Sequence, residues 1–166
     1  MAAYADAVIG AAQGDLAAGD VQAARRRAGL ALTNLQVAVQ RSLAEIGGDA
    51  DAMTAIIRAS AALQRLSSTL NVMLQTAPMF ARSRPALAPF RAAFVSGLAD
   101  PCRREPSIGD LREHMPPPDR SAEAAALSQI LDHLVSALEM LRAAEWVVPF
   151  ELSQPRRLKA RQHSLI

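Results

Sequence analysis

The sequence contains a single cysteine, Cys102, and few aromatic residues, which make up 4% of its 166 positions. One cysteine excludes an internal disulfide framework and a zinc site built from a cysteine cluster. Hydrophobic residues reach 51% and are largely alanine and leucine, a balance that argues against a β-sandwich or barrel. Because alanine is the strongest helix former, the composition predicts an all-α protein. At this length the core is large enough to need no covalent staples.

The sequence also lacks a long apolar run and a secretory signal. No uninterrupted hydrophobic stretch reaches the roughly 18 residues that a membrane span requires. The opening stretch, 1–6, has no basic group ahead of an apolar segment, so it does not read as a signal peptide. We therefore expect a reduced, cytosolic helical protein, or an excised piece of a longer one.

Lysine is nearly absent, so the positive charge comes from arginine. Of the 18 basic residues only Lys159 is a lysine, and the formal net charge is +2. Three consecutive arginines occupy 25–27, inside a helical pattern. A basic C-terminal tail at 151–166 can contact nucleic acid or anionic lipid, although a solvated chain end is the simpler explanation. The basic residues of this tail are Arg156, Arg157, Lys159 and Arg161.

Hydrophobic spacing predicts a helical bundle of about five helices, three long and two shorter, with no strands. The long helices are expected at 20–46, from about 50 to 76 and at 121–147, and the shorter ones at 2–18 and around 87–98. Together they predict one helical-bundle domain at 1–150. The expected N-caps of the long helices are Asp20, Asp49 or Asp51, and Ser121.

The stretch Gly47-Gly48-Asp49 separates two long helices and predicts an antiparallel hairpin, because glycine readily takes the left-handed conformation that ends a helix. On the helix at 20–46, Leu30 and Val37 lie beside the main apolar stripe. This second strip can pack on the first or the fourth predicted helix, or it can bind a partner helix or a second copy.

Prolines interrupt the chain between the fourth and fifth predicted helices. The region 100–120 contains Asp100-Pro101, Glu105-Pro106 and the triple proline 116–118. Because consecutive prolines favour an extended polyproline conformation, we expect a proline-rich mobile loop at 100–120.

No motif for catalysis, metal binding or cofactor binding emerges. The three histidines, His114, His133 and His163, have no His or Glu three or four positions away in a ligating arrangement. Arg103 and Arg104 beside Cys102 favour a thiolate, but the surrounding loop offers no scaffold for a substrate. Glycine loops for phosphate and acidic loops for calcium are incomplete. The sequence therefore predicts no catalytic residue, no metal and no cofactor, and the protein is not expected to be an enzyme.

Nucleic acid is not an expected partner. The predicted helices are too long for a helix-turn-helix unit, and aromatic residues that could stack on single strands are nearly lacking. What remains is an interaction protein whose leftover apolar surface serves a partner helix or self-association.

Residues 20–45 resemble the soluble part of the FUSC family, bacterial inner-membrane proteins described as fusaric-acid resistance or aromatic-acid exporters. The family pattern has an arginine pair, a small-residue run, an asparagine and then apolar-Gln-Arg-x-Leu-x-Glu. A Leu-x-Arg-Leu core follows in the next helix, and the chain departs from relatives by lacking a proline after Glu45. The matching positions are Arg25, Arg26, Ala28 to Leu32, Asn34, Val39-Gln40-Arg41-Ser42-Leu43-Ala44-Glu45 and Leu63-Gln64-Arg65-Leu66.

The resemblance covers roughly residues 4–76 and, more weakly, the final predicted helix. It implies the non-catalytic cytoplasmic domain of a transporter that exports aromatic carboxylic acids. The domain would lie on the cytoplasmic side of the bacterial inner membrane and serve oligomerisation or gating. Its implied partners are the transmembrane part of the same protein and further copies in a homo-oligomer, with anionic lipid or an aromatic acid as further contacts. The candidate interaction residues are Arg25, Arg26, Arg41 and Arg65.

Three alternatives stay open. The same arginines can form structural ion pairs with Glu45 or Asp49 instead of reaching a partner. The chain can also be a freestanding helical adaptor or regulatory protein. A helical ligand-binding enzyme, whose site the spacing rules miss, is the third.

Overall fold

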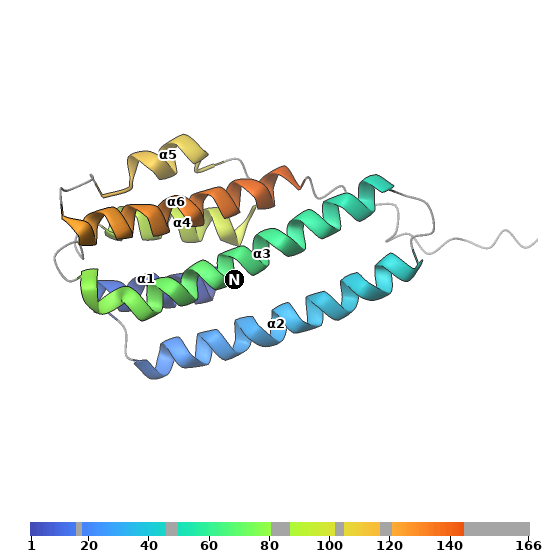
Figure 1. The fold of residues 1–166 in the computed structure, drawn as a ribbon, viewed down its shortest axis with the longest axis horizontal. Helices are drawn as coiled ribbons and strands as arrows, with labels where there is room; N and C mark the ends of the chain where they lie inside the picture. The colour runs from blue at the N-terminus through green and yellow to red at the C-terminus, as the bar shows by residue number, and fades with distance from the viewer. Residues whose placement is uncertain (16–17, 46–49, 81–86, 102–104, 117–120, 145–166) are drawn as a thin grey trace, which may run out of the picture.

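The structure, a computed structural model, describes residues 1–15, 18–45, 50–80, 87–101, 105–116 and 121–144 (Figure 1). Within these ranges it is helical and contains no strand, which confirms the predicted all-α bundle. The helices are α1 (Ala2–Gln13), α2 (Ala18–Glu45), α3 (Ala50–Thr76), the 3-10 turn η1 (Ala77–Phe80), α4 (Leu87–Ala99), α5 (Ile108–Glu113) and α6 (Ala122–Ala143).

Helix α1 is short but lies inside the bundle, in contact with α2, α3 and α4. Val8 and Ile9 are fully buried, and alanines at this helix surface allow the neighbouring helices to approach closely. The helix ends earlier than the predicted 2–18 because Gly14 takes a left-handed conformation with φ 86°. The amide of Gly14 bonds to the Ala11 carbonyl and that of Asp15 to the Gly10 carbonyl, the Schellman pattern of a helix end.

Helices α3 and α6 form the most extensive helix–helix contact of the bundle. Leu66 and Leu70 of α3 and Leu134 and Leu138 of α6 are fully buried, as their helical spacing predicts. Each large apolar side chain buried in this way contributes roughly 1.5–3 kcal/mol to stability. This pair is therefore the principal source of the hydrophobic core.

The fourth predicted helix is confirmed as α4, with Leu87, Phe90 and Phe94 fully buried. The two phenyl rings stack with their centroids 5.3 Å apart. Pro89 is tolerated because it lies in the first turn, where a backbone amide has no partner within the helix.

Helix α5 lies within the stretch 100–120 for which the sequence suggested only a loop, so the helix count exceeds the predicted five. A capping box starts it: the Ser107 hydroxyl accepts from the Asp110 amide at 3.1 Å, and the Asp110 carboxylate accepts from the Ser107 amide at 2.7 Å. Leu111 anchors the helix in the core. The capping box and the buried leucine thus both hold this short helix, together with its contacts to α4 and α6.

Helices α2 and α3 form a long arm that extends past the ends of α1, α4 and α6 (Figure 1). Asp20 and Asp51 lie in the first turns of these helices rather than at the N-caps. Ser121 is the N-cap of α6 as predicted, since its hydroxyl accepts from the Ala124 amide. The predicted turn at Gly47-Gly48-Asp49 and the predicted tail at 151–166 lie outside the described residues, as does Cys102.

Candidate functional site

The outer face of α2 carries apolar side chains that no described residue covers. Val21 and Ala28 are buried on the inner face, against α1 and α3. Leu30 and Val37 lie on the opposite side of the helix, seven residues apart, with 68% and 43% of their surface exposed. The second apolar strip predicted from the sequence is therefore real, and it faces solvent rather than α1 or α4.

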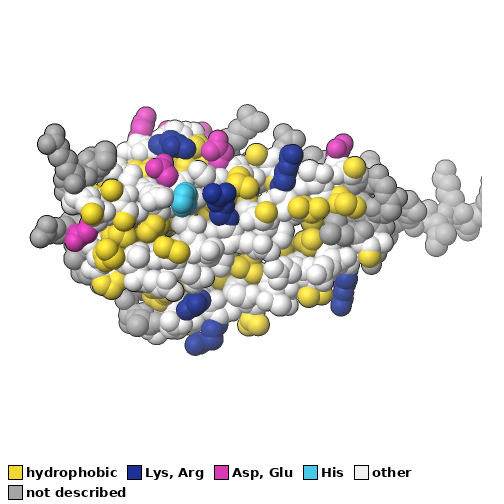
Figure 2. Space-filling view, in the orientation of Figure 1, with side chains coloured by type: hydrophobic (Ala, Val, Ile, Leu, Met, Phe, Trp, Pro, Cys, Tyr) yellow, Lys and Arg dark blue, Asp and Glu magenta, His cyan; other side chains and the backbone are white. Residues whose placement is uncertain are grey.

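The predicted interaction residues Arg25, Arg26 and Arg41 are all exposed on α2, and Arg65 is exposed on α3. Figure 2 shows arginines together with hydrophobic side chains along the lower edge, which α2 forms. Within the described part of the chain the side chains of these four arginines make no hydrogen bond or ion pair. The alternative pairing with Glu45 or Asp49 involves side chains outside the described ones.

The structure does not gather the four arginines into one cluster. Arg26 and Arg41 lie on the outer face, on either side of Leu30 and Val37, whereas Arg25 lies closer to the inner side. The positive charge of Arg25 acts on Tyr4, although burial outweighs it and raises the pKa of the Tyr4 hydroxyl.

The outer face of α2 reads nearly the same in both directions along the helix. At 100° per residue one stripe runs along this face, and its midpoint falls between residues 33 and 34. Counted from either end towards this midpoint, the stripe has a small residue, then an arginine, then an aliphatic residue and then a polar residue. In chain order its members are Ala23, Arg26, Leu30, Thr33, Asn34, Val37, Arg41 and Ala44. A search of the sequence for one apolar stripe that faces the core does not find this pattern. A comparison of residues seven positions apart along the helix would find it.

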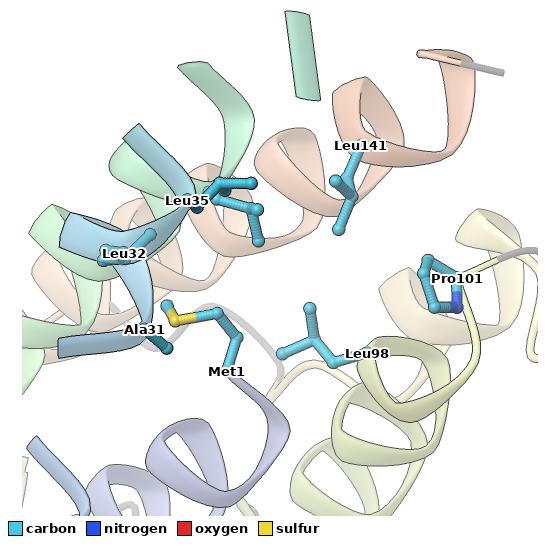
Figure 3. A pocket seen from close by; sticks show the side chains of 8 residues that line it. Met1, Ala31, Leu32, Leu35, Leu98, Pro101 and Leu141 are labelled. Atoms are coloured by element: carbon cyan, nitrogen blue, oxygen red, sulfur yellow. The ribbon is translucent and has the colours of Figure 1, made fainter. Parts of the chain in front are cut away.

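An apolar pocket of about 260 Å³ lies between α2 and the rest of the bundle. Figure 3 shows side chains of α2 facing those of α4 and α6 across it, with Met1 at its base. Only apolar side chains line this pocket, which therefore suits an apolar occupant. Its main lining residues are Met1, Leu32, Leu35, Leu63, Leu98 and Leu141.

The histidines and acids form no recognisable reaction centre in the described residues. His133 is exposed on α6, and the Nδ1 of His114 lies 2.6 Å from the Asp110 carbonyl oxygen, to which it donates. Where the chain is described, no three His, Cys, Asp or Glu side chains come together as metal ligands would.

Arg91 and Arg142, which the sequence analysis did not single out, make contacts that hold the bundle together. Arg91 of α4 binds Asp6 of α1 at 2.7 Å, and Arg142 of α6 donates to the Pro106 carbonyl.

Comparison with known proteins gives no match, whether to a family model, a curated protein or a solved structure. Over the ranges that the structure describes, none of the helices has the length and hydropathy to cross a membrane.

Proposed function

We propose that this chain is a non-catalytic helical assembly domain that pairs with a second copy of itself through the outer face of α2. The observation that carries the proposal is the exposed apolar pair on that face, Leu30 and Val37, which the described residues leave uncovered. A two-fold interface brings the same patch from both copies together, so that residue i meets j and j meets i. Two α2 helices that lie antiparallel, centred between residues 33 and 34, meet this requirement and bring the apolar side chains of both copies together.

In the antiparallel pair, Leu30 of one copy lies against Val37 of the other, on both sides of the midpoint. The two contacts remove from water the apolar surface that the single chain leaves exposed. This burial stabilises the dimer by about 25 cal/mol of free energy for each Å² of apolar surface. One helix pair is small compared with interfaces that bury 1,200–2,000 Å². We therefore expect a weak dimer that forms as the protein concentration rises.

The same register sets Arg26 beside Arg41 of the second copy. Like charges repel, so this contact weakens the pair unless an anion lies between the two guanidinium groups, which bind carboxylate and phosphate through paired N–H bonds. Assembly would then respond to anions, a property suited to a regulatory domain.

The FUSC resemblance would place this assembly domain on the cytoplasmic side of a transporter for aromatic acids. In support, the positions that match the family's arginines and asparagine, such as Arg26, Asn34 and Arg41, are exposed on α2 and are not needed for the core. Sequencing the DNA upstream of Met1 for in-frame membrane spans tests this part of the proposal. A freestanding reading frame would contradict it and leave the assembly role intact.

Sedimentation velocity over a range of protein concentrations tests the assembly role. We expect the wild-type chain to shift from monomer to dimer, and Leu30→Glu to remain monomeric because a carboxylate replaces the central apolar contact. The matched control is Ile57→Glu on α3, at a residue that is 48% exposed but lies off the proposed face; it should dimerise like the wild type. A wild-type chain that stays monomeric at every concentration would contradict the proposal.

A further inference from the structure

The apolar pocket has the size and the walls to hold an aromatic side chain. Its volume is about 260 Å³, and an apolar cavity of about 150 Å³ already binds benzene. Leu32 and Leu35 on one side and Leu98 and Leu141 on the other leave the middle of the pocket free (Figure 3). The α2 leucines are only half-buried, so an occupant would complete their burial.

The distribution of aromatic residues points to an occupant within this chain. The sequence has six aromatic residues, and the four in the described ranges (Tyr4, Phe80, Phe90 and Phe94) are at most 2% exposed. The remaining two are Trp146 and Phe150, which bracket Val147, Val148 and Pro149. This is the last apolar run of the chain, since polar and basic residues predominate after it.

The described end of α6, after which this run follows in the sequence, lies at the pocket. Leu141 lines the pocket, and Ala144, one turn further on the same face, is the C-cap and is 3% exposed. An extended chain covers about 3.3–3.6 Å per residue, so the two positions from Ala144 to Trp146 can span at most about 7 Å. Docking of a tethered segment avoids the loss of translational freedom that a separate partner would incur. We infer that the pocket is the docking site of the segment 146–150 of the same chain, with the Trp146 indole inside it.

The fluorescence of Trp146 tests this inference, because it is the only tryptophan in the sequence. We expect the native protein to emit at a shorter wavelength than the urea-unfolded chain and to resist quenching by acrylamide. Leu35→Gln, in the pocket wall, should move the emission to longer wavelength and increase the quenching rate several-fold. Val37→Gln, on the opposite face of the same helix, is the matched control and should change neither property.

An independent measurement needs no variant: nuclear Overhauser contacts between the Trp146 indole and the methyl groups of Leu35 or Leu141 are expected in the wild-type protein. Emission like that of the unfolded chain, or a lack of such contacts, would overturn the inference. A blue shift that grows with protein concentration would also overturn it, since the segment would then dock on a second copy. The inference is separable from the assembly role, because Leu30→Glu should keep the native Trp146 signal.

Discussion

Arg142 of α6 lies directly over Gly97 of α4, with its Nη2 only 2.9 Å from the position that a Cβ atom at residue 97 would occupy. The Leu138 side chain lies 3.2 Å from the same position. Arg142 has little freedom to withdraw, because its Nη1 donates to the Pro106 carbonyl at 2.8 Å. Burial lowers the pKa of the Arg142 guanidinium, whose Nε and Nη2 have no hydrogen-bond partner among the described residues. A glycine inside α4 thus leaves room for the Arg142 bond that joins α6 to the segment just before α5.

This contact predicts opposite effects for two glycine-to-alanine substitutions in helices. Gly29→Ala on α2 meets no atom within 4 Å and should stabilise the protein by about 0.5–1 kcal/mol, the usual gain in helix propensity. Gly97→Ala should instead destabilise it by about 1 kcal/mol, because overpacking costs about 1–3 kcal/mol. Urea unfolding of the two variants measures both values, and equal stabilisation by both would show that Arg142 moves aside freely.

Tyr4 joins α1 to α3, since its hydroxyl donates to the Asn71 side-chain oxygen at 2.7 Å. Removing this bond by Tyr4→Phe should cost about 0.5–1.5 kcal/mol at neutral pH. Burial also raises the pKa of the Tyr4 hydroxyl, with a smaller opposing effect from Arg25. The contribution of Tyr4 to the free energy of unfolding is therefore complete below the unfolded pKa of about 10. It declines as the pH rises through the pKa of the folded state.

The pH dependence can be read directly, because Tyr4 is the only tyrosine in the sequence. Ultraviolet titration should show tyrosinate forming at a higher pH in the native protein than in the urea-unfolded chain. The stability of Tyr4→Phe should fall less than that of the wild type between pH 9 and about pH 11. Titration at the same pH in both states would contradict the burial of this hydroxyl.

Asp110 holds the start of α5, and its pKa is lowered mainly by the hydrogen bond from the Ser107 amide. Because the pKa of Asp110 is lower in the folded state, its carboxylate stabilises the fold at a pH above the unfolded pKa of about 3.9. This stabilisation disappears as the pH falls through the pKa of the folded state. The amide resonances of Ser107 and Asp110 should therefore shift in acid, whereas that of Ala124, which is capped by the Ser121 hydroxyl, should not. In Asp110→Asn the Ser107 shift should vanish, and its persistence would rule out the capping carboxylate as its source.

The helical positions could be predicted from the sequence wherever an apolar stripe is long and regular. Leu66 and Leu70 recur at helical spacing on α3, as Phe90 and Phe94 do on α4, and all four are fully buried. The prediction failed at α5 because the Ser107–Asp110 box lies among prolines and glycine, with one buried leucine instead of a stripe. Short helices are stabilised by tertiary contacts, which spacing does not reveal.

The periodic spacing of apolar residues also does not show which element covers an apolar helix face. The stripe of α2 predicts a buried face, yet Leu32 and Leu35 are only half-buried because α2 packs mainly on α1 and α3 at the edge of the bundle. The bonds of Arg91 to Asp6 and Gln13 connect positions far apart in sequence, so no local pattern predicts them. The four arginines proposed as interaction residues are exposed on α2 and α3, and their separation over different faces could not be predicted without the structure.

A charge-swap series in sedimentation equilibrium tests most directly whether two α2 helices pair antiparallel about the midpoint of residues 33 and 34. In that register each Arg26 lies beside Arg41 of the second copy, so Arg26→Glu replaces two repulsive contacts by two attractive ones and should tighten the dimer several-fold at low salt. The double variant, Arg26→Glu with Arg41→Glu, restores like charges and should weaken the dimer to about the wild-type level or below. If Arg26→Glu weakens association, or both variants behave alike, the antiparallel assembly is wrong.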